Sequence, residues 1–372
     1  MFKQPTGQTY GYYNGFKGVF YATSMGCFSH EYYLPLSFRL FTMKHISIIV
    51  PRGSVIIDTI IGPFNLLQMA NSHYKRTNGL NQAPFAIELV GLSSEPEVYQ
   101  KRFQVKPDKT IDQIEKTDLV IISAISGNLQ DGIDRNKDFI SWIKKQRVEN
   151  DAELASLCKG AFLLAETGLL TGKSCSTHWT VQNEFTLRYP DINLAPEKII
   201  SEDSGIYSSG GAYSFLNFML YIIEKFYGRD TAIFCSKVSE IDIDRFDQSH
   251  FMIFNGQKEH QDEAIKKAQI FIEQNYEDRI NISELAAQVG VSARNFLRRF
   301  KKATANTPKE YISRVKVEAA KRKFESTILN IQEVMLFVGY NDEKAFRNTF
   351  RKYSGLSPKQ YQTKYNRELA LA

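Results

Sequence analysis

The sequence predicts an α/β domain with a doubly wound, mostly parallel sheet, followed by an all-α domain with two helix-turn-helix units. Three observations support this. Apolar segments of strand length alternate with helical segments in the first two thirds of the chain, one helical pattern occurs twice near the carboxyl terminus, and basic charge is concentrated in the last third. At 372 residues, the chain is long enough for two domains and a connection.

Residues 1–43 are rich in Tyr, Phe and Gly and show little periodicity. They lack the basic start, apolar middle and small-residue cleavage site of a secretory signal. We expect them to form a loosely ordered, aromatic-rich extension, with Met43 as the working start of the protein.

A front domain is expected over residues 44–228, where continuous apolar runs indicate parallel strands covered on both faces. The expected strands are Ile46–Val50, Phe85–Val90, Leu119–Ser123, Leu154–Leu157 and Gly205–Ser208. The expected helices are Ile60–Ala70, Phe139–Gln146, Ala161–Thr167 and Tyr213–Phe226. Ligands of such sheets bind beyond the carboxyl ends of the strands, so candidate chemistry is expected there.

The clearest candidate site is at Cys158, where an apolar strand ends. Gly160 follows two residues later and a helix begins at once, which is the shape of a nucleophile elbow. A helix N-terminus at this point would favour a thiolate or a bound anion. A small buried residue at a crowded turn explains the same pattern equally well.

Other strand ends supply further candidates for a ligand pocket. Asp58 lies near the end of the first strand-loop, although it serves equally well as a cap for the next helix. Ser209 and Gly210 open the last helix of the domain and could cradle an anion or simply pack closely. His178 is expected to line the cleft, although a lone histidine is more often structural. Lys159 completes the set because it directly follows Cys158.

Residues 229–261 contain polar clusters and no long helical pattern, so they are expected to connect the domains. A helix over Glu263–Gln274 then opens a second domain, residues 262–372. From Asp262 onward there are 21 basic and 13 acidic residues, a net charge of +8, against 26 and 28, a net charge of −2, before it. The overall charge of +6 therefore belongs to the second domain alone, as an electrostatic footprint for nucleic acid should.

The second domain contains one pattern twice, offset by 49 residues up to its glycine and by 50 after it. The first copy consists of Ile282, Leu285, Ala286, Val289, Gly290, Phe296, Phe300, Pro308 and Tyr311. The second copy consists of Ile331, Val334, Met335, Val338, Gly339, Phe346, Phe350, Pro358 and Tyr361.

Each copy predicts a short helix, a tight turn and a second helix. Apolar residues at i, i+3, i+4 and i+7 form one face of a helix, and the glycine suits a left-handed residue that ends it. Ser292 and Asn341 are expected to cap the second helices. Two phenylalanines four residues apart then turn one aromatic face of each second helix inward.

The outward residues of the second helices predict DNA reading. Arg and Asn suit bidentate contacts with base edges, and Lys suits phosphates. The first set is Arg294, Asn295, Arg298, Arg299 and Lys302, with Lys301 beside it. The second set is Glu343, Lys344, Arg347, Asn348 and Arg351. A basic solvated face on an ordinary helical bundle is the alternative, but two matched copies favour nucleic-acid binding.

The tail from about Asp262 to Tyr365 resembles the DNA-binding domain of AraC/XylS-type transcription regulators. The run that carries the resemblance is Val338-Gly339-Tyr340, Phe346, Phe350-Arg351-Lys352, Gly355, Ser357-Pro358 and Tyr361. Met335 and Gln362 depart from the usual pattern, outside the reading helices. The resemblance implies that both reading helices enter successive major grooves, about 34 Å apart.

The front domain resembles the class I glutamine amidotransferase-like superfamily that includes the PfpI proteases, and in particular the GlxA-type regulators. Ala161–Lys173 and Thr177-His178-Trp179 carry this resemblance. In the enzymes of the superfamily, an elbow Cys works with a His and an acid, and Cys158 and Asp58 match the Cys and the acid. Lys159 stands where proteases often have the His.

These resemblances imply a transcription regulator that binds promoter DNA, with RNA polymerase, a small-molecule effector and a second copy of the chain as partners. A non-catalytic sensor domain is expected, although a live cysteine hydrolase or a thiol redox sensor is the alternative. Another alternative is an amidase or protease whose basic tail only targets it to the nucleoid.

Four cysteines are present, Cys27, Cys158, Cys175 and Cys235, without a Cys-x-x-Cys pair. Neither a zinc site nor a disulfide framework is therefore expected, and no metal or cofactor. This cysteine usage predicts a reduced, cytoplasmic protein. No apolar run approaches the ~20 residues of a membrane span.

Overall fold

The computed structural model describes residues 44–243, 245 and 247–366. The expectations for residues 1–43, including the working start at Met43, lie outside the described residues, as does Cys27.

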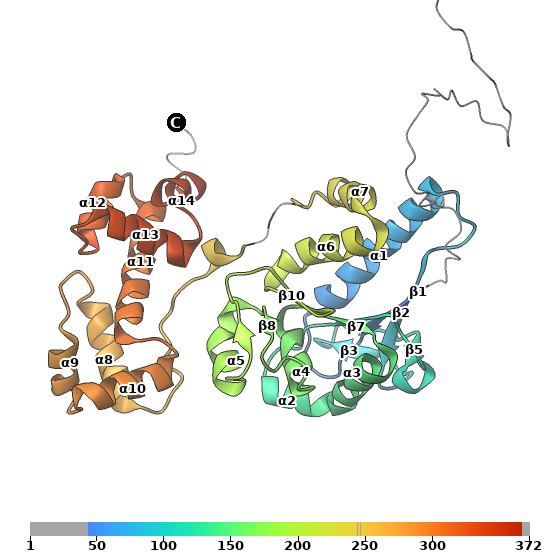
Figure 1. Cartoon of the computed structure of the whole chain (residues 1–372), viewed down its shortest axis with the longest axis horizontal. Helices are drawn as coiled ribbons and strands as arrows, with labels where there is room; N and C mark the ends of the chain where they lie inside the picture. Colours follow the sequence, from blue (N-terminus) through green and yellow to red (C-terminus); the bar gives the residue numbers. More distant parts are fainter. Residues whose placement is uncertain (1–43, 244, 246, 367–372) are drawn as a thin grey trace, which may run out of the picture. The chain divides into compact units, whose positions relative to one another are not determined.

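The front domain is built on a seven-stranded sheet in the order β10-β11-β7-β6-β1-β2-β5 (Figure 1). Its strands are β1 Lys44–Ile49, β2 Phe85–Gly91, β5 Lys109–Thr110, β6 Leu119–Ile122, β7 Glu153–Ser156, β10 Ile200–Asp203 and β11 Ile206–Ser209. Neighbouring strands are parallel except β10, which pairs antiparallel with β11. The predicted mostly parallel α/β sheet is confirmed.

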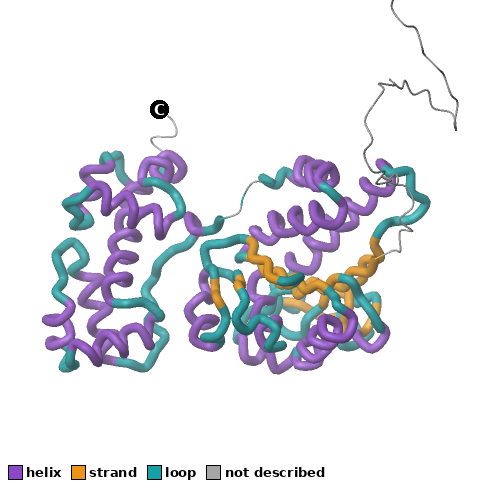
Figure 2. The backbone as a smooth tube through the Cα atoms, in the orientation of Figure 1, coloured by secondary structure: helices purple, strands orange, loops and turns teal. Residues whose placement is uncertain are grey.

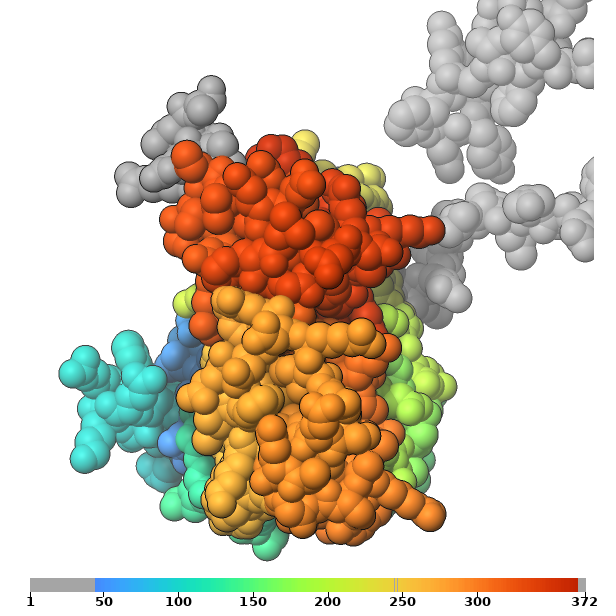
Figure 3. Space-filling view, turned by 90° about the vertical axis from the view of Figure 1, so that its left-hand side faces the viewer, coloured from blue at the N-terminus to red at the C-terminus, as the bar shows by residue number. Residues whose placement is uncertain are grey.

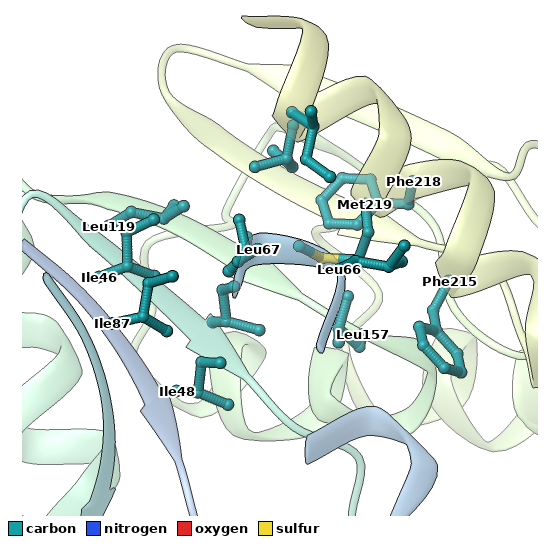
Figure 4. Packing of buried hydrophobic residues seen from close by; sticks show 14 of the residues in the cluster. Ile46, Ile48, Leu66, Leu67, Ile87, Leu119, Leu157, Phe215, Phe218 and Met219 are labelled. Carbon is teal, nitrogen blue, oxygen red and sulfur yellow. The ribbon is translucent and has the colours of Figure 1, made fainter. Parts of the chain in front are cut away.

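Helices cover both faces of this sheet because its central strands are apolar on both sides. On one face lie α1 Asp58–Thr77, α6 Phe215–Tyr227 and α7 Arg229–Ser239. On the other lie α2 Leu129–Arg135, α3 Lys137–Asn150, α4 Ala161–Glu166 and α5 Gln182–Arg188. Each face encloses a separate core, and Figure 4 shows Phe218 and Met219 of α6 packed toward Leu66 of α1 in the first of them.

Short elements complete the front domain. A hairpin is formed by β3 Glu97–Tyr99 and β4 Phe103–Val105, and a parallel pair by β8 Ser174–Cys175 and β9 Asn193–Leu194. The 3₁₀ turns are η1 Ile111–Gln113, η2 Cys158–Gly160, η3 Trp179–Val181, η4 Ala212–Ser214 and, after the domain, η5 Ser249–Phe251. The sequence predicted none of the short strands, because two- and three-residue strands carry no readable period, whereas η2 is the turn predicted at Cys158.

Helix α7 differs from the expected connection over residues 229–261, for which no long helix was predicted. It runs for 11 residues, and Ala232 and Cys235 enter the core beside α1 and α6. Only a narrow stripe of α7 is buried, so its apolar pattern is weak in the sequence. The segment free of long helices is therefore shorter than expected and begins after Ser239.

The tail is all helical, as predicted (Figure 2). Its helices are α8 Glu263–Gln274, α9 Ile282–Gln288, α10 Ala293–Thr304, α11 Pro308–Ser326, α12 Ile331–Phe337, α13 Glu343–Ser354 and α14 Pro358–Tyr365. The long helix α11 joins the two helix-turn-helix units. Its Tyr311 packs in the core of the first unit, whereas Val317 and Phe324 pack in the core of the second.

The turns of both units have the predicted left-handed glycine: Gly290 and Gly339 each have φ +70°. The expected caps are only partly right. Ser292 occupies the cap position of α10 without a side-chain hydrogen bond. In the second unit Asp342, not Asn341, caps α13, because its carboxylate accepts a hydrogen bond from the Ala345 N–H at 2.8 Å. The second turn is one residue longer than the first, as the change of offset from 49 to 50 indicates, and this extra residue moves the cap by one position.

Within the described part of the chain, no helix has the length and apolar character needed to cross a membrane.

Candidate nucleic-acid interface and front-domain site

The two reading helices, α10 and α13, have the same construction. Each is 12 residues long and buries two phenylalanines, whose ring centroids are 5.5 Å apart in α10 and 5.8 Å apart in α13. These rings fix the rotation of each helix, so the charged side chains point outward. Figure 3 shows one side of the tail as a space-filling surface, to which segments of both units contribute.

Most of the predicted DNA contacts lie on the exposed faces of these helices. The exposed residues are Arg294, Arg298 and Lys302 on α10, and Glu343, Lys344, Arg347, Asn348 and Arg351 on α13. Asn295 is half-buried, and its side-chain oxygen accepts a hydrogen bond from Arg298 Nη2 at 2.8 Å. On α13 the Arg347 Nε donates to Glu343 Oε1 at 2.6 Å. Both units therefore hold an arginine by a polar neighbour on the same helix, ready to exchange that partner for a base edge or phosphate.

Arg299 differs from the other predicted contacts. It is half-buried, and its guanidinium makes two hydrogen bonds, 2.8 and 2.6 Å long, to the carboxylate of Asp262. The same carboxylate accepts from the Ile265 N–H at 3.2 Å and so caps α8. These bonds lower the pKa of Asp262. Arg299 thus fastens α10 to α8 in this structure and is not placed on the exposed reading face.

Leu297 is a residue of the reading face that the sequence-based prediction passed over. It lies on α10 between two exposed arginine positions and is 48% exposed. Its place one residue after Phe296, on the outward side of the helix, was the signal that could have identified it.

The front domain contains the predicted elbow. Cys158 follows β7 with φ +52°, a left-handed conformation that a non-glycine residue adopts at a cost. Gly160 is required beside it, because a Cβ there would lie 2.3 Å from the carbonyl oxygen of Ile122. Cys158 is 1% exposed. The chain therefore holds one thiol in a strained turn at the carboxyl end of a central strand.

Two loops fasten this elbow. The Cys158 N–H donates to the Ser209 hydroxyl at 3.4 Å, and the Thr177 hydroxyl donates to the Cys158 carbonyl at 2.9 Å. The His178 ring packs against Gly211, where a Cβ would lie 2.0 Å from the ring. The structure thus brings Cys158 together with the loops that contain His178, Ser209 and Gly210.

The charges around the elbow favour neutral groups. Burial raises the pKa of the Cys158 thiol, and the backbone N–H groups of Ala212 and Lys159 offset this only in part. Burial, together with the Lys159 ammonium, lowers the pKa of His178 to about 4. His178 Nδ1 instead accepts a hydrogen bond from the Thr180 N–H at 3.1 Å. A thiolate–imidazolium pair requires the opposite shifts.

Asp58 is not part of this constellation. It is exposed at the start of α1, and the next residue, Thr59, faces inward instead. The Thr59 hydroxyl donates to the Ile56 carbonyl at 2.6 Å and accepts from the Ala124 N–H at 2.9 Å. The acid that the resemblance placed at the elbow is therefore turned to solvent.

Gln248, after the front domain, is the residue of this site that the sequence did not reveal. It is 2% exposed. Its side-chain oxygen accepts from the Gly211 N–H at 3.0 Å, and its nitrogen donates to the carbonyls of Pro196 at 2.8 Å and Thr177 at 3.2 Å. A lone glutamine in a polar connection gives no signal, since its partners are carbonyls distant in sequence.

Among residues 44–243, 245 and 247–366, no group of three or more His, Cys, Asp and Glu side chains could hold a metal ion.

Comparisons with known proteins match the two parts separately. The family model described as DJ-1/PfpI family matches residues 71–225, and the one described as Helix-turn-helix domain matches residues 285–364. The HTH-type transcriptional regulator GbdR of Pseudomonas aeruginosa is 26% identical over 263 residues, which are 69% of this chain and 69% of GbdR. The HTH-type transcriptional regulator CdhR of the same species is 24% identical over 71% of this chain and 78% of CdhR.

Among solved structures, Drosophila melanogaster DJ-1beta is similar to 54% of this chain over 100% of its own length, with 17% identity and a TM-score of 0.45. The sequence matches and the geometry agree on the composition of the molecule: the chain joins a DJ-1/PfpI-type domain to an AraC-type helix-turn-helix domain.

Proposed function

We propose that this chain is a DNA-binding transcription regulator that recognises specific promoter sequences with its tail and responds to a small-molecule effector at its front domain. The observation that carries the proposal is the pair of matched reading helices, α10 and α13, each with buried phenylalanines and an exposed charged face. Two such helices, in units joined by the single long helix α11, suit two major-groove segments of one duplex, about 34 Å apart.

Charge supports the same conclusion. The tail carries a net charge of +8 and the remaining chain −2, so attraction to a polyanion is confined to the domain with the reading helices. Lysines at the ends of the reading helices would neutralise phosphates, which fixes the register of the protein without sequence preference. Arginines and asparagines nearer the helix centres would read base edges.

The effector site that we propose lies around Cys158, between the loops of Thr177-His178 and Ser209-Gly210. Backbone N–H groups of Lys159 and Ala212 point at the thiol, so the turn can stabilise an anionic or strongly polar ligand atom. The neutral thiol and neutral imidazole support a binding role and not catalysis. A cysteine hydrolase is the second candidate, favoured by the strained elbow alone.

Gln248 supplies a physical route from this site to the tail. Its amide holds the two loops that touch Cys158 and His178. The next residues form η5, and the His250 carbonyl accepts a hydrogen bond from the Tyr365 hydroxyl at 3.3 Å. A ligand that moves either loop would change the partners of Gln248. Regulation follows if the ligand binds the two arrangements with different affinity.

The proposal includes a cytoplasmic homodimer that contacts RNA polymerase at the promoter, as the family resemblance implies. The working domains are residues 44–228, extended by α7, and 262–372.

Two measurements on the full chain test the proposal. Metabolites are screened for a thermal shift of the wild type, and each hit is added to a binding assay with the genomic fragment that the protein selects. We expect one hit to change the DNA affinity of the wild type. Gln248→Ala should still bind both the metabolite and DNA, but the metabolite should no longer change its DNA affinity. A Gln248→Ala variant that keeps full coupling would rule out this route.

A chain that shows no preference for any genomic fragment would refute the regulator assignment. A hit that is turned over, with loss of turnover in Cys158→Ser, would establish the hydrolase instead.

A further inference from the structure

The two reading helices correspond residue by residue at an offset of 50, since their buried phenylalanines occupy equivalent positions. Charged or amide groups stand at four exposed pairs: Arg294 with Lys344, Arg298 with Asn348, Lys301 with Arg351, and Lys302 with Lys352. Near the helix centres one exposed pair differs in kind, because Leu297 corresponds to Arg347; at the helix starts Ala293 corresponds to Glu343. The two helices are therefore not equivalent readers at the centre of their exposed faces.

Leu297 leaves about half of an apolar side chain in water: it is 48% exposed. Exposed Arg294 lies one turn before it and exposed Lys301 one turn after it on the same face. The Arg298 guanidinium, which could otherwise cover the leucine, is turned to Asn295 at 2.8 Å. An apolar group framed by cations fits a partner that is anionic at its edges and apolar at one point.

Duplex DNA offers such a surface. Its phosphates line the edges of the major groove, and the 5-methyl group of thymine is the apolar feature on the groove floor. A protein partner would need an apolar pocket for Leu297, with acidic groups on both sides of it at the spacing of Arg294 and Lys301. A DNA groove has that arrangement wherever a thymine lies on its floor.

We propose that Leu297 packs against the 5-methyl group of one thymine in the half-site read by α10. At the equivalent place on α13, the Arg347–Glu343 pair presents only polar groups, so the half-site read by α13 has no methyl requirement there. This inference rests on the proposed DNA-binding function and deepens it: the two half-sites differ in sequence, and a leucine sets part of the difference.

Deoxyuridine tests the inference directly, because it differs from thymidine only by the 5-methyl group. In the fragment that the full chain selects, each thymine of the α10 half-site is replaced singly by deoxyuridine, and the Kd is measured at fixed salt. We expect one replacement to weaken wild-type binding about fourfold, the effect of one buried methyl group. Leu297→Ala should bind the unmodified fragment more weakly and lose nothing further at that position.

Two variants serve as controls. Leu297→Met keeps an apolar contact and should retain the sensitivity to the missing methyl group. Leu336→Ala removes a leucine that is also exposed, at 54%, but lies on α12 and not on a reading helix, so it should leave the sensitivity unchanged.

Failure has two distinguishable forms. If the wild type binds the unmodified fragment but no replacement changes its Kd by more than about twofold, or if Leu297→Ala keeps the sensitivity, the thymine contact is refuted while DNA binding stands. If the wild type selects no fragment at all, the proposed function fails and this inference fails with it.

Discussion

The Arg299 guanidinium binds both carboxylate oxygens of Asp262, with Nε 2.8 Å from Oδ2 and Nη2 2.6 Å from Oδ1. Because Asp262 also caps α8, one carboxylate ties the start of the tail domain to its first reading helix. The basic charge of Arg299 and its place on α10 predicted a DNA contact, but in the structure its guanidinium is bound to Asp262. Arg298, its neighbour in the sequence, remains exposed for the duplex.

Arg299→Ala should slightly lower the free energy of unfolding of the tail, since it removes two charge-assisted hydrogen bonds from a partly exposed pair. Far-UV circular dichroism during urea unfolding follows the helices of both domains, whereas fluorescence follows the front domain alone, which contains both tryptophans, Trp142 and Trp179. A change that is seen in the dichroism but not in the fluorescence therefore belongs to the tail. Only the dichroism transition should move. An unchanged dichroism midpoint would show that the ion pair contributes nothing. Arg298→Ala is the matched control and should leave both transitions in place.

Arg298→Ala should relax specificity at one base position, at a cost of about 1–3 kcal/mol against the preferred base. Lys302→Ala should weaken binding to all sequences alike and reduce the slope of log K against log salt by about 1. Affinities for the selected fragment, its single-base variants and random DNA distinguish the two roles. Equal losses on selected and random DNA for both variants would contradict the assignment. Arg347→Ala and Asn348→Ala should behave like Arg298→Ala in the other groove.

Cys158 should react slowly with a thiol probe at pH 7, because burial raises the pKa of its thiol. In a Cys27→Ser background, the rate should keep rising as the pH increases toward 9. Burial raises the pKa of Cys175 to about 12 and that of Cys235 to about 11, so neither competes, and Cys158→Ser provides the baseline. A rate that reaches a plateau between pH 5 and 7 would reveal a thiolate and revive the hydrolase.

His178 should make the front domain less stable in acid. Its pKa in the folded protein is about 4, mainly because of burial, whereas an unfolded histidine titrates near its ordinary value of about 6.5. Between pH 6.5 and 4, the His178 imidazole is protonated in the unfolded chain but stays neutral in the folded chain. The stabilisation is therefore complete above about pH 6.5 and declines as the pH falls toward 4.

The change from pH 7 to pH 5 should cost roughly 1 kcal/mol through His178, after allowance for its partial exposure. The urea midpoint of the fluorescence transition measures it at both pH values. His178→Asn should flatten the difference between them. A midpoint in the variant that falls as steeply as in the wild type would show that other groups control the acid response.

The sequence predicted what depends on local pattern. The helix Glu263–Gln274 was predicted with the bounds that the structure gives, and the central strands were predicted to within about two residues, because their apolar runs are continuous. The left-handed glycines and the elbow glycine were predictable for the same reason: each is required by the residues beside it in the chain.

Features that depend on distant partners were not predictable. Arg299 is 37 residues from Asp262 in the sequence, and Gln248 holds carbonyls up to 71 residues away. Asp58 was expected in the site from its place after the first strand and from the resemblance, but the turn of α1 directs Thr59 inward and leaves the acid exposed. Leu297 was missed because the prediction considered only charged and amide side chains on the second helices, although its place one residue after Phe296 turns it outward.

Nuclease protection of selected genomic fragments by the full chain, at moderate ionic strength, tests the central claim most directly. The account predicts two protected tracts of different sequence on one face of the duplex, about one helical turn apart. Arg298→Ala should weaken only the first tract and Arg347→Ala only the second. A single continuous footprint without sequence preference, lost uniformly as salt rises, would contradict the account.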